Sequence, residues 1–124
     1  MDVTVFGMGY VGCVTAACFA EIGHSVTGVD LQEIKVSLIN SGKSPIIEPG
    51  LEELIGRGVE AGRLHATQRA QRLGDFSLVC VGTPSQANGN LDLVYMKRVC
   101  EEIGDALRNK AARHRVVFRS TMLP

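Results

Sequence analysis

The sequence predicts an α/β fold in which helices cover both faces of one parallel sheet. Short runs of β-branched residues alternate along the chain with longer helical patterns, which is typical of right-handed βαβ units. The strand runs lack a clear polar alternation, as expected for strands that are covered on both sides. With 124 residues, of which 45% are hydrophobic, the chain has the size of one domain with one buried core.

The individual elements follow from local patterns. Strands are expected at residues 3–6, 25–29, 64–66, 78–81 and 116–118, and helices at residues 10–22, 31–40, 51–61 and 91–110, with a short helix at 68–74. Gly23 ends the first helix and the glycine at position 42 follows the end of the second. Two prolines make residues 43–50 a loop, and residues 82–90 form another. The expected strand order is 3-2-1-4-5.

The run Gly7-Met8-Gly9-Tyr10-Val11-Gly12 has the spacing of a dinucleotide-binding loop. Chance produces such spacings in a chain with 14 glycines, but this run follows a predicted strand and opens a predicted helix, as the motif requires. We expect Gly7 to make the tight turn, Gly9 to let the backbone approach a pyrophosphate, and Gly12 to let helix and sheet pack closely. The fold is therefore predicted to be a Rossmann-type doubly wound parallel sheet.

The first turn of that helix is expected to hold the phosphates. Its N–H groups have no partner within the helix, and the helix N-terminus carries a partial positive charge. Tyr10 and Val11 lie on this turn, so their backbone N–H groups are the expected donors.

Asp30 is the candidate ligand of the adenosine ribose. It ends the second predicted strand, at the usual place of the acid that binds ribose hydroxyls. A carboxylate there repels a 2′-phosphate and no arginine follows at once, so NAD is favoured over NADP. Asp30 alternatively caps the next helix, and the two roles are compatible. Lys35, one turn into that helix, either reaches the ribose or adenine edge or is a solvated surface lysine.

The charge balance and the scattered histidines and cysteines indicate no nucleic-acid, membrane or metal-binding site. The 13 basic and 13 acidic residues balance without a basic stripe, so a nucleic-acid partner is not expected. No apolar run suits a membrane span or a signal peptide, and we expect a cytoplasmic protein with no membrane partner. The three histidines are expected at the surface or in turns without partners, and no metal site is expected. The cysteines are expected to be reduced, buried and structural; they are Cys13, Cys18, Cys80 and Cys100.

Beyond the glycine run, several segments resemble the UDP-glucose/GDP-mannose dehydrogenase family. These segments are Gly28-Val29-Asp30, residues 39–51 with Glu48-Pro49-Gly50-Leu51, Val81-Gly82-Thr83-Pro84, residues 88–93, and Arg119-Ser120-Thr121-Met122-Leu123-Pro124. The second and third of these are more specific than the glycine run. The resemblance spans essentially the whole chain, and the GDP-mannose 6-dehydrogenase branch of the family is the most similar.

The resemblance implies an NAD-dependent oxidation of the C6 hydroxyl of a nucleotide sugar to a carboxylate, in two steps that reduce two NAD. The family's cofactor contacts match Tyr10, Val11, Asp30, Lys35, Thr83 and Thr121 in this sequence. Thr83 and Thr121 follow the fourth and fifth predicted strands, at the carboxyl edge where an open α/β sheet binds its ligand. The alternative is that one is a turn residue and the other only a strand-end residue.

The resemblance also implies that the catalytic residues lie outside these 124 residues. In this family a cysteine nucleophile, a lysine, an asparagine and a glutamate follow the matched segment, and none of the four cysteines here matches the nucleophile. We therefore expect residues 1–124 to be a truncated NAD-binding domain, without the central helix and the substrate-binding domain, and inactive alone. The full-length enzyme is expected to bind a nucleotide-sugar substrate and to be a homo-oligomer.

One segment departs from the family pattern. Family members carry Thr-Thr-Asp after the third strand, whereas this chain has Ala66-Thr67-Gln68-Arg69 and a helix that is shortened before Asp75. This departure leaves open a stand-alone NAD(H)-binding module that has no catalytic role. A dehydrogenase of the β-hydroxyacid type is a further alternative, but the family-specific segments argue against it.

Overall fold

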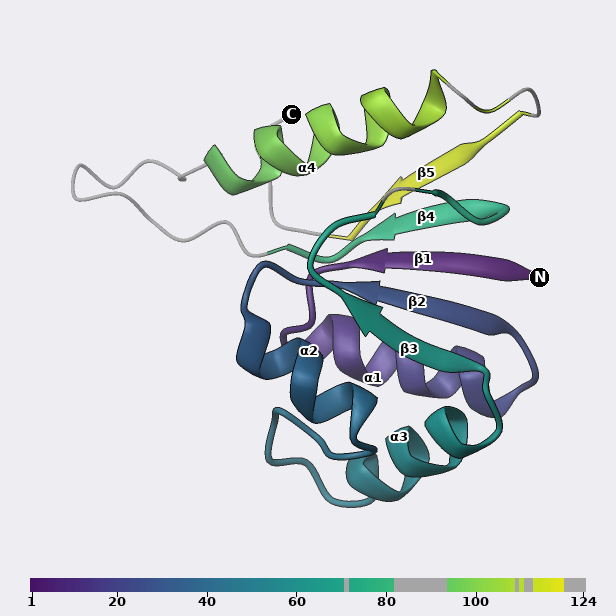
Figure 1. Cartoon of the computed structure of the whole chain (residues 1–124), viewed down its shortest axis with the longest axis vertical. Helices are drawn as coiled ribbons and strands as arrows, with labels where there is room; N and C mark the ends of the chain where they lie inside the picture. Colours follow the sequence, from purple (N-terminus) through teal and green to yellow (C-terminus); the bar gives the residue numbers. More distant parts are fainter. Residues whose placement is uncertain (71, 82–93, 109, 111–112, 120–124) are drawn as a thin grey trace.

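The computed structural model describes residues 1–70, 72–81, 94–108, 110 and 113–119. Five strands form one parallel sheet in the order β3-β2-β1-β4-β5, which confirms the predicted order and the Rossmann-type fold. All strand arrows in Figure 1 point the same way, so the carboxyl ends of the strands gather at one edge. The elements are β1 (Asp2–Phe6), α1 (Tyr10–Glu21), β2 (Ser25–Val29), α2 (Glu33–Asn40), α3 (Leu51–Glu60), β3 (Leu64–Thr67), β4 (Phe76–Val79), α4 (Val94–Leu107) and β5 (Arg115–Phe118).

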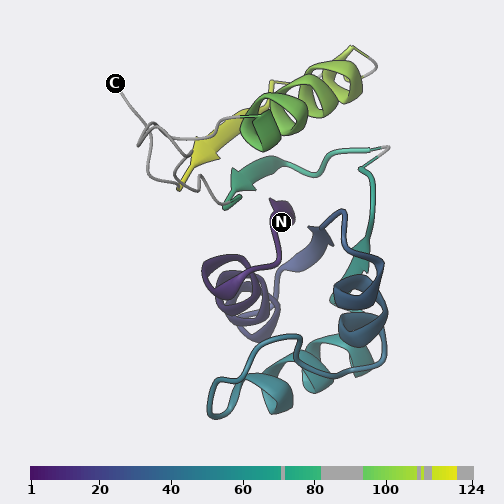
Figure 2. The same ribbon diagram turned by 90° about the vertical axis from the view of Figure 1, so that its left-hand side faces the viewer.

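Helices α1, α2 and α3 pack on one face of the sheet and α4 on the other, as Figures 1 and 2 show. Because side chains alternate along a strand, Val3 and Val5 of β1 join the first layer while Phe6 joins the second. Helix α1 buries only small side chains, which lets it lie close to β1 and β2. Helix α4 buries Met96, Val99 and Ile103 against the second layer.

The predicted helix at 68–74 is wrong, because none of the described residues of this segment is helical. Its backbone bonds to other elements instead of to itself. The Ala70 N–H donates to the Glu102 carboxylate on α4, and the Gly74 N–H donates to the Thr4 hydroxyl on β1, 3.1 Å away. The Lys110 ammonium donates to the Gly74 carbonyl. Because these polar groups bond to other elements, the described residues of the crossover from β3 to β4 (68–70 and 72–75) form no helix, and they are called the strap below.

The strap leaves part of the α4 side of the sheet uncovered. A groove of about 630 Å³ lies there over the first halves of β1 and β2 and over residues 65–67 of β3. The side chains that β1, β2 and β3 present to this groove include Thr4, Thr27 and His65. This face is therefore polar at these positions and apolar at Phe6 and Val29, so the strands show a partial polar alternation that was not expected from the sequence.

Three other expectations need correction. Cys18 and Cys100 are exposed on α1 and α4, whereas Cys13 is buried and Cys80 half-buried. His114 has partners on both ring nitrogens, since Nε2 lies 2.8 Å from the Ser77 hydroxyl and Nδ1 lies 2.8 Å from the Lys110 ammonium. The fourth strand lies two residues earlier than predicted.

Among the described residues, no helix is long and apolar enough to cross a membrane and no cluster is suited to a metal ion.

Candidate cofactor site

The glycine loop rests on the ends of two strands. Gly7 has φ of +97°, a conformation that favours glycine, and its N–H donates to the Val29 carbonyl of β2 at 2.7 Å. A Cβ on Gly7 would lie 2.9 Å from the carbonyl carbon and oxygen of Cys80, just after β4. The tight turn expected at Gly7 is thus present, and it is closely packed between the ends of β2 and β4.

The second and third glycines have opposite surroundings. A Cβ on Gly12 would lie only 1.7 Å from the Gly7 carbonyl oxygen, so α1 packs directly against the loop. Among the residues that the structure describes, no atom lies within 4 Å of a Cβ built on Gly9, so these residues leave the space in front of Gly9 open. Gly9 is the N-cap residue of α1, and the first turn contains no acidic side chain. The loop therefore presents open space and first-turn N–H groups to an anion.

The buried Met8 side chain packs against β2 and so supports the glycine loop, a role that was not predicted from the sequence. Its side chain is completely buried, and a Cβ on Gly28 of β2 would lie 2.6 Å from its sulfur. The signal was available as a glycine inside a strand, which marks a close approach by another group. The Cys13 thiol donates to the Met8 carbonyl at 3.2 Å, and burial raises the pKa of Cys13 to about 12. Cys13 is thus an unreactive neutral thiol at physiological pH.

Asp30 binds the glycine loop and its own turn at once. One carboxylate oxygen accepts the Met8 N–H at 2.8 Å, and the other accepts the Gln32 N–H at 2.9 Å. The residue is buried, and the Lys35 ammonium lies 3.9 Å from the oxygen that faces Met8. The N-cap residue of α2 is Gln32, so Asp30 is not the cap itself. Each carboxylate oxygen has a second lone pair that remains able to accept a hydroxyl.

Tyr10 contacts the loop that carries the Glu-Pro-Gly-Leu segment. The negative charge of Glu48 raises the pKa of the Tyr10 phenol, and the two side chains are hydrogen-bonded. Half of the Tyr10 side chain is exposed beside the open space at Gly9. The structure thus brings together five predicted positions on the loop with Asp30 and Lys35, whereas Thr83 and Thr121 lie outside the described residues.

Comparison with known proteins then decides the family. Residues 1–124 match the UDP-glucose/GDP-mannose dehydrogenase family, NAD binding domain. The chain belongs to this family. Its cofactor is accordingly NAD, and the β-hydroxyacid alternative is set aside.

Individual relatives agree with this assignment. The chain is 54% identical to GDP-mannose 6-dehydrogenase from Pseudomonas savastanoi pv. phaseolicola and 41% identical to UDP-glucose 6-dehydrogenase from Haloferax volcanii, in each case over the whole chain and 29% of the relative. A crystal structure of a ternary complex of GDP-mannose dehydrogenase from Pseudomonas aeruginosa superposes with a TM-score of 0.97 at 53% identity, covering 100% of this chain and 29% of that one. The chain therefore spans less than a third of the length of these relatives.

Proposed function

We propose that the glycine loop, Asp30 and Lys35 bind NAD, and that this domain supplies the cofactor half of a nucleotide-sugar 6-dehydrogenase. Gly7, Gly9 and Gly12 shape the loop, and the N–H groups of Tyr10 and Val11 bind the pyrophosphate. Asp30 and Lys35 bind the adenosine ribose. We also propose that the hydroxyls of Thr83 and Thr121 contact the cofactor near its ribose and phosphate portions. The bound NAD supplies the hydride acceptor for oxidation of a sugar C6 hydroxyl to a carboxylate.

One observation carries this proposal: the described part of the chain leaves the space in front of Gly9 open, although Gly7 and Gly12 on either side are tightly packed. A loop shaped only by packing has no need for a glycine at position 9, whose φ of −78° suits any residue. A pyrophosphate at that place requires it, because a side chain there would occupy the approach to the first turn of α1. The buried carboxylate of Asp30 then stands beside this space, bonded to the loop.

The substrate and the assembly of the whole protein belong to the same proposal. The 54% identity to a GDP-mannose 6-dehydrogenase favours GDP-mannose over UDP-glucose. We expect the whole protein to be a cytoplasmic homo-oligomer. We also propose that the catalytic residues lie outside residues 1–124, so we expect these residues alone to be inactive. A non-catalytic NAD(H)-binding module would use the same cofactor site.

The substitution Gly9→Val tests the phosphate role of the loop. Among the described residues, no atom lies within 4 Å of the new Cβ, so we expect the variant to fold, with a modest loss of stability because valine is a poorer N-cap residue than glycine. The side chain would occupy the pyrophosphate space, and we expect NAD affinity to fall at least about tenfold. Isothermal titration calorimetry measures the affinity, and thermal unfolding measures the stability.

Gly104→Ala is the matched control, because a Cβ at that position in α4 also meets no atom within 4 Å. We expect it to bind NAD like the parent chain. If Gly9→Val folds and binds NAD as tightly as Gly104→Ala, the pyrophosphate does not lie at Gly9.

A further inference from the structure

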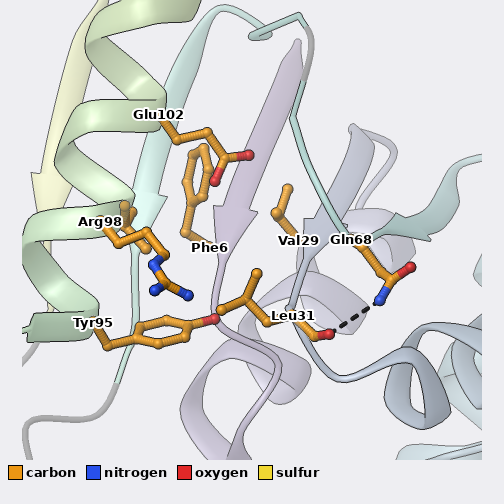
Figure 3. Close-up of a pocket in the computed structure, with 8 residues that line it drawn as sticks. Phe6, Val29, Leu31, Gln68, Tyr95, Arg98 and Glu102 are labelled. Carbon is orange, nitrogen blue, oxygen red and sulfur yellow. Dashed lines mark hydrogen bonds between the residues drawn. The ribbon is translucent and has the colours of Figure 1, made fainter.

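The turn that follows Asp30 is held from two sides. The Leu31 carbonyl accepts a hydrogen bond from the Gln68 side-chain amide at 3.1 Å, and the Tyr95 hydroxyl is hydrogen-bonded to the Leu31 backbone. Figure 3 shows both side chains reaching Leu31, Gln68 from the β3 side and Tyr95 from α4. Leu31 lies between Asp30 and Gln32, the two residues joined by the bond that fixes the carboxylate.

Tyr95 joins the two halves of the fold at this point. It lies on α4, in the half built from β4 and β5, whereas Leu31 follows β2 in the other half. The Tyr95 ring packs in the layer that contains Phe6 and Val29. A second tie lies further along α4, where the Glu102 carboxylate accepts the Ala70 N–H. The strap and the turn are therefore both attached to one helix.

The space between α4 and the turn is already filled. The cavity lined by Phe6, Leu31, Tyr95 and Val99 has a volume of about 10 Å³. A water molecule needs at least about 10–15 Å³, so an adenine base has no room there. Tyr95 thus contacts the turn from the side of α4, and the opposite side of Leu31, which is 42% exposed, is left free for a cofactor base.

We propose that Tyr95 and Gln68 are positioning residues for the adenosine half of the cofactor, because they hold the turn at Leu31 and thereby orient the Asp30 carboxylate. This inference rests on the proposed cofactor site and goes beyond it, since it assigns both side chains to the Leu31 backbone and not to the cofactor. These two contacts with the Leu31 backbone are called the brace. A fixed Leu31 holds the Gln32 N–H against one carboxylate oxygen, which leaves the other oxygen directed at Met8 and the ribose space. The Thr-Thr-Asp departure of this chain is then functional, because Gln68 provides an amide donor at the end of β3.

A double-mutant cycle on NAD affinity tests the brace. Tyr95→Phe removes only the hydroxyl, and we expect it to weaken NAD binding by about three- to tenfold, the effect of one lost hydrogen bond. If Tyr95 acts through Asp30, the same change in an Asp30→Asn background should weaken binding by less than about twofold. Gln68→Ala should behave like Tyr95→Phe in both backgrounds. Lys97→Ala, on the exposed side of α4, is the matched control and should bind NAD like the parent chain.

A cofactor-free measurement separates the brace from the proposed function. Amide hydrogen exchange at Met8 and Gln32 should be faster in Tyr95→Phe than in Lys97→Ala, because both N–H groups donate to Asp30. A parent chain that fails to bind NAD would contradict the proposed function, while the exchange result would still decide the brace. Unchanged exchange would overturn the inference, and so would an equal loss of NAD affinity in the two backgrounds.

Discussion

Asp30 connects the cofactor site to the fold at the scale of one residue. Its position after the second strand was predicted from spacing alone, because the glycine run and the acid are both local features. Its bond to the Met8 N–H was not predictable, since it depends on how the loop folds back over β2. The same holds for Gly28, whose missing side chain makes room for Met8. The sequence therefore identified the functional groups but not the contacts that orient them.

His114 should make the stability of the chain depend on pH. Burial lowers its pKa below the ordinary value of 6.5, and the positive charge of Lys110 lowers it further. In the neutral ring, Nδ1 accepts from the Lys110 ammonium, and protonation would turn this acceptor into a donor. The stabilising contribution is thus complete above pH 6.5 and is lost as the pH falls through the lowered pKa.

The variant His114→Gln isolates this contribution. We expect the parent chain to unfold at a higher temperature than the variant above pH 6.5, and the difference to shrink as the pH is lowered. Thermal unfolding of both proteins between about pH 5 and 8 measures it, a range that spans the usual titration of histidine. A difference that stays constant with pH would show that His114 does not titrate differently on folding.

At the scale of elements, the strap between β3 and β4 is the part that sequence patterns misjudged. Residues 68–74 are polar and contain Ala and Leu, which suited a short helix. The deciding interactions are distant in sequence, since Thr4, Glu102 and Lys110 take the polar groups of the strap. Helices α1 and α3 and strand β2 were predicted well, because their apolar runs and end signals are local.

Gly74→Ala tests how closely the strap approaches β1. A Cβ there would lie 2.4 Å from the Asp2 carbonyl oxygen, so one of the two segments must shift. We expect a loss of about 1–3 kcal/mol in the free energy of unfolding, the usual cost of overpacking. Urea denaturation measures the change. Gly104→Ala provides the comparison, because it adds the same methyl group to open space in a helix and should not destabilise. Equal stability of the two variants would mean that the strap lies farther from β1.

At the scale of the whole molecule, the glycine loop, Asp30 and the ends of β2 and β4 meet at the carboxyl edge of the sheet. Parallel strands bring these segments together although they are distant in sequence, which is why the fold class predicted the place of the site. The sequence did not predict that α4 would be tied across this edge through Tyr95 and Glu102. Those ties depend on the side-chain packing of the two halves.

The most direct test of the central claim is a calorimetric titration of the purified 124-residue chain with NAD and with NADP. The carboxylate of Asp30 is buried and bonded to the glycine loop, and we propose that it binds the adenosine ribose, where it would repel a 2′-phosphate. We predict that NAD binds and that NADP binds at least about tenfold more weakly, a difference of about 1.4 kcal/mol. Equal affinity for the two cofactors, or tighter binding of NADP, would contradict the placement of the adenosine ribose at Asp30.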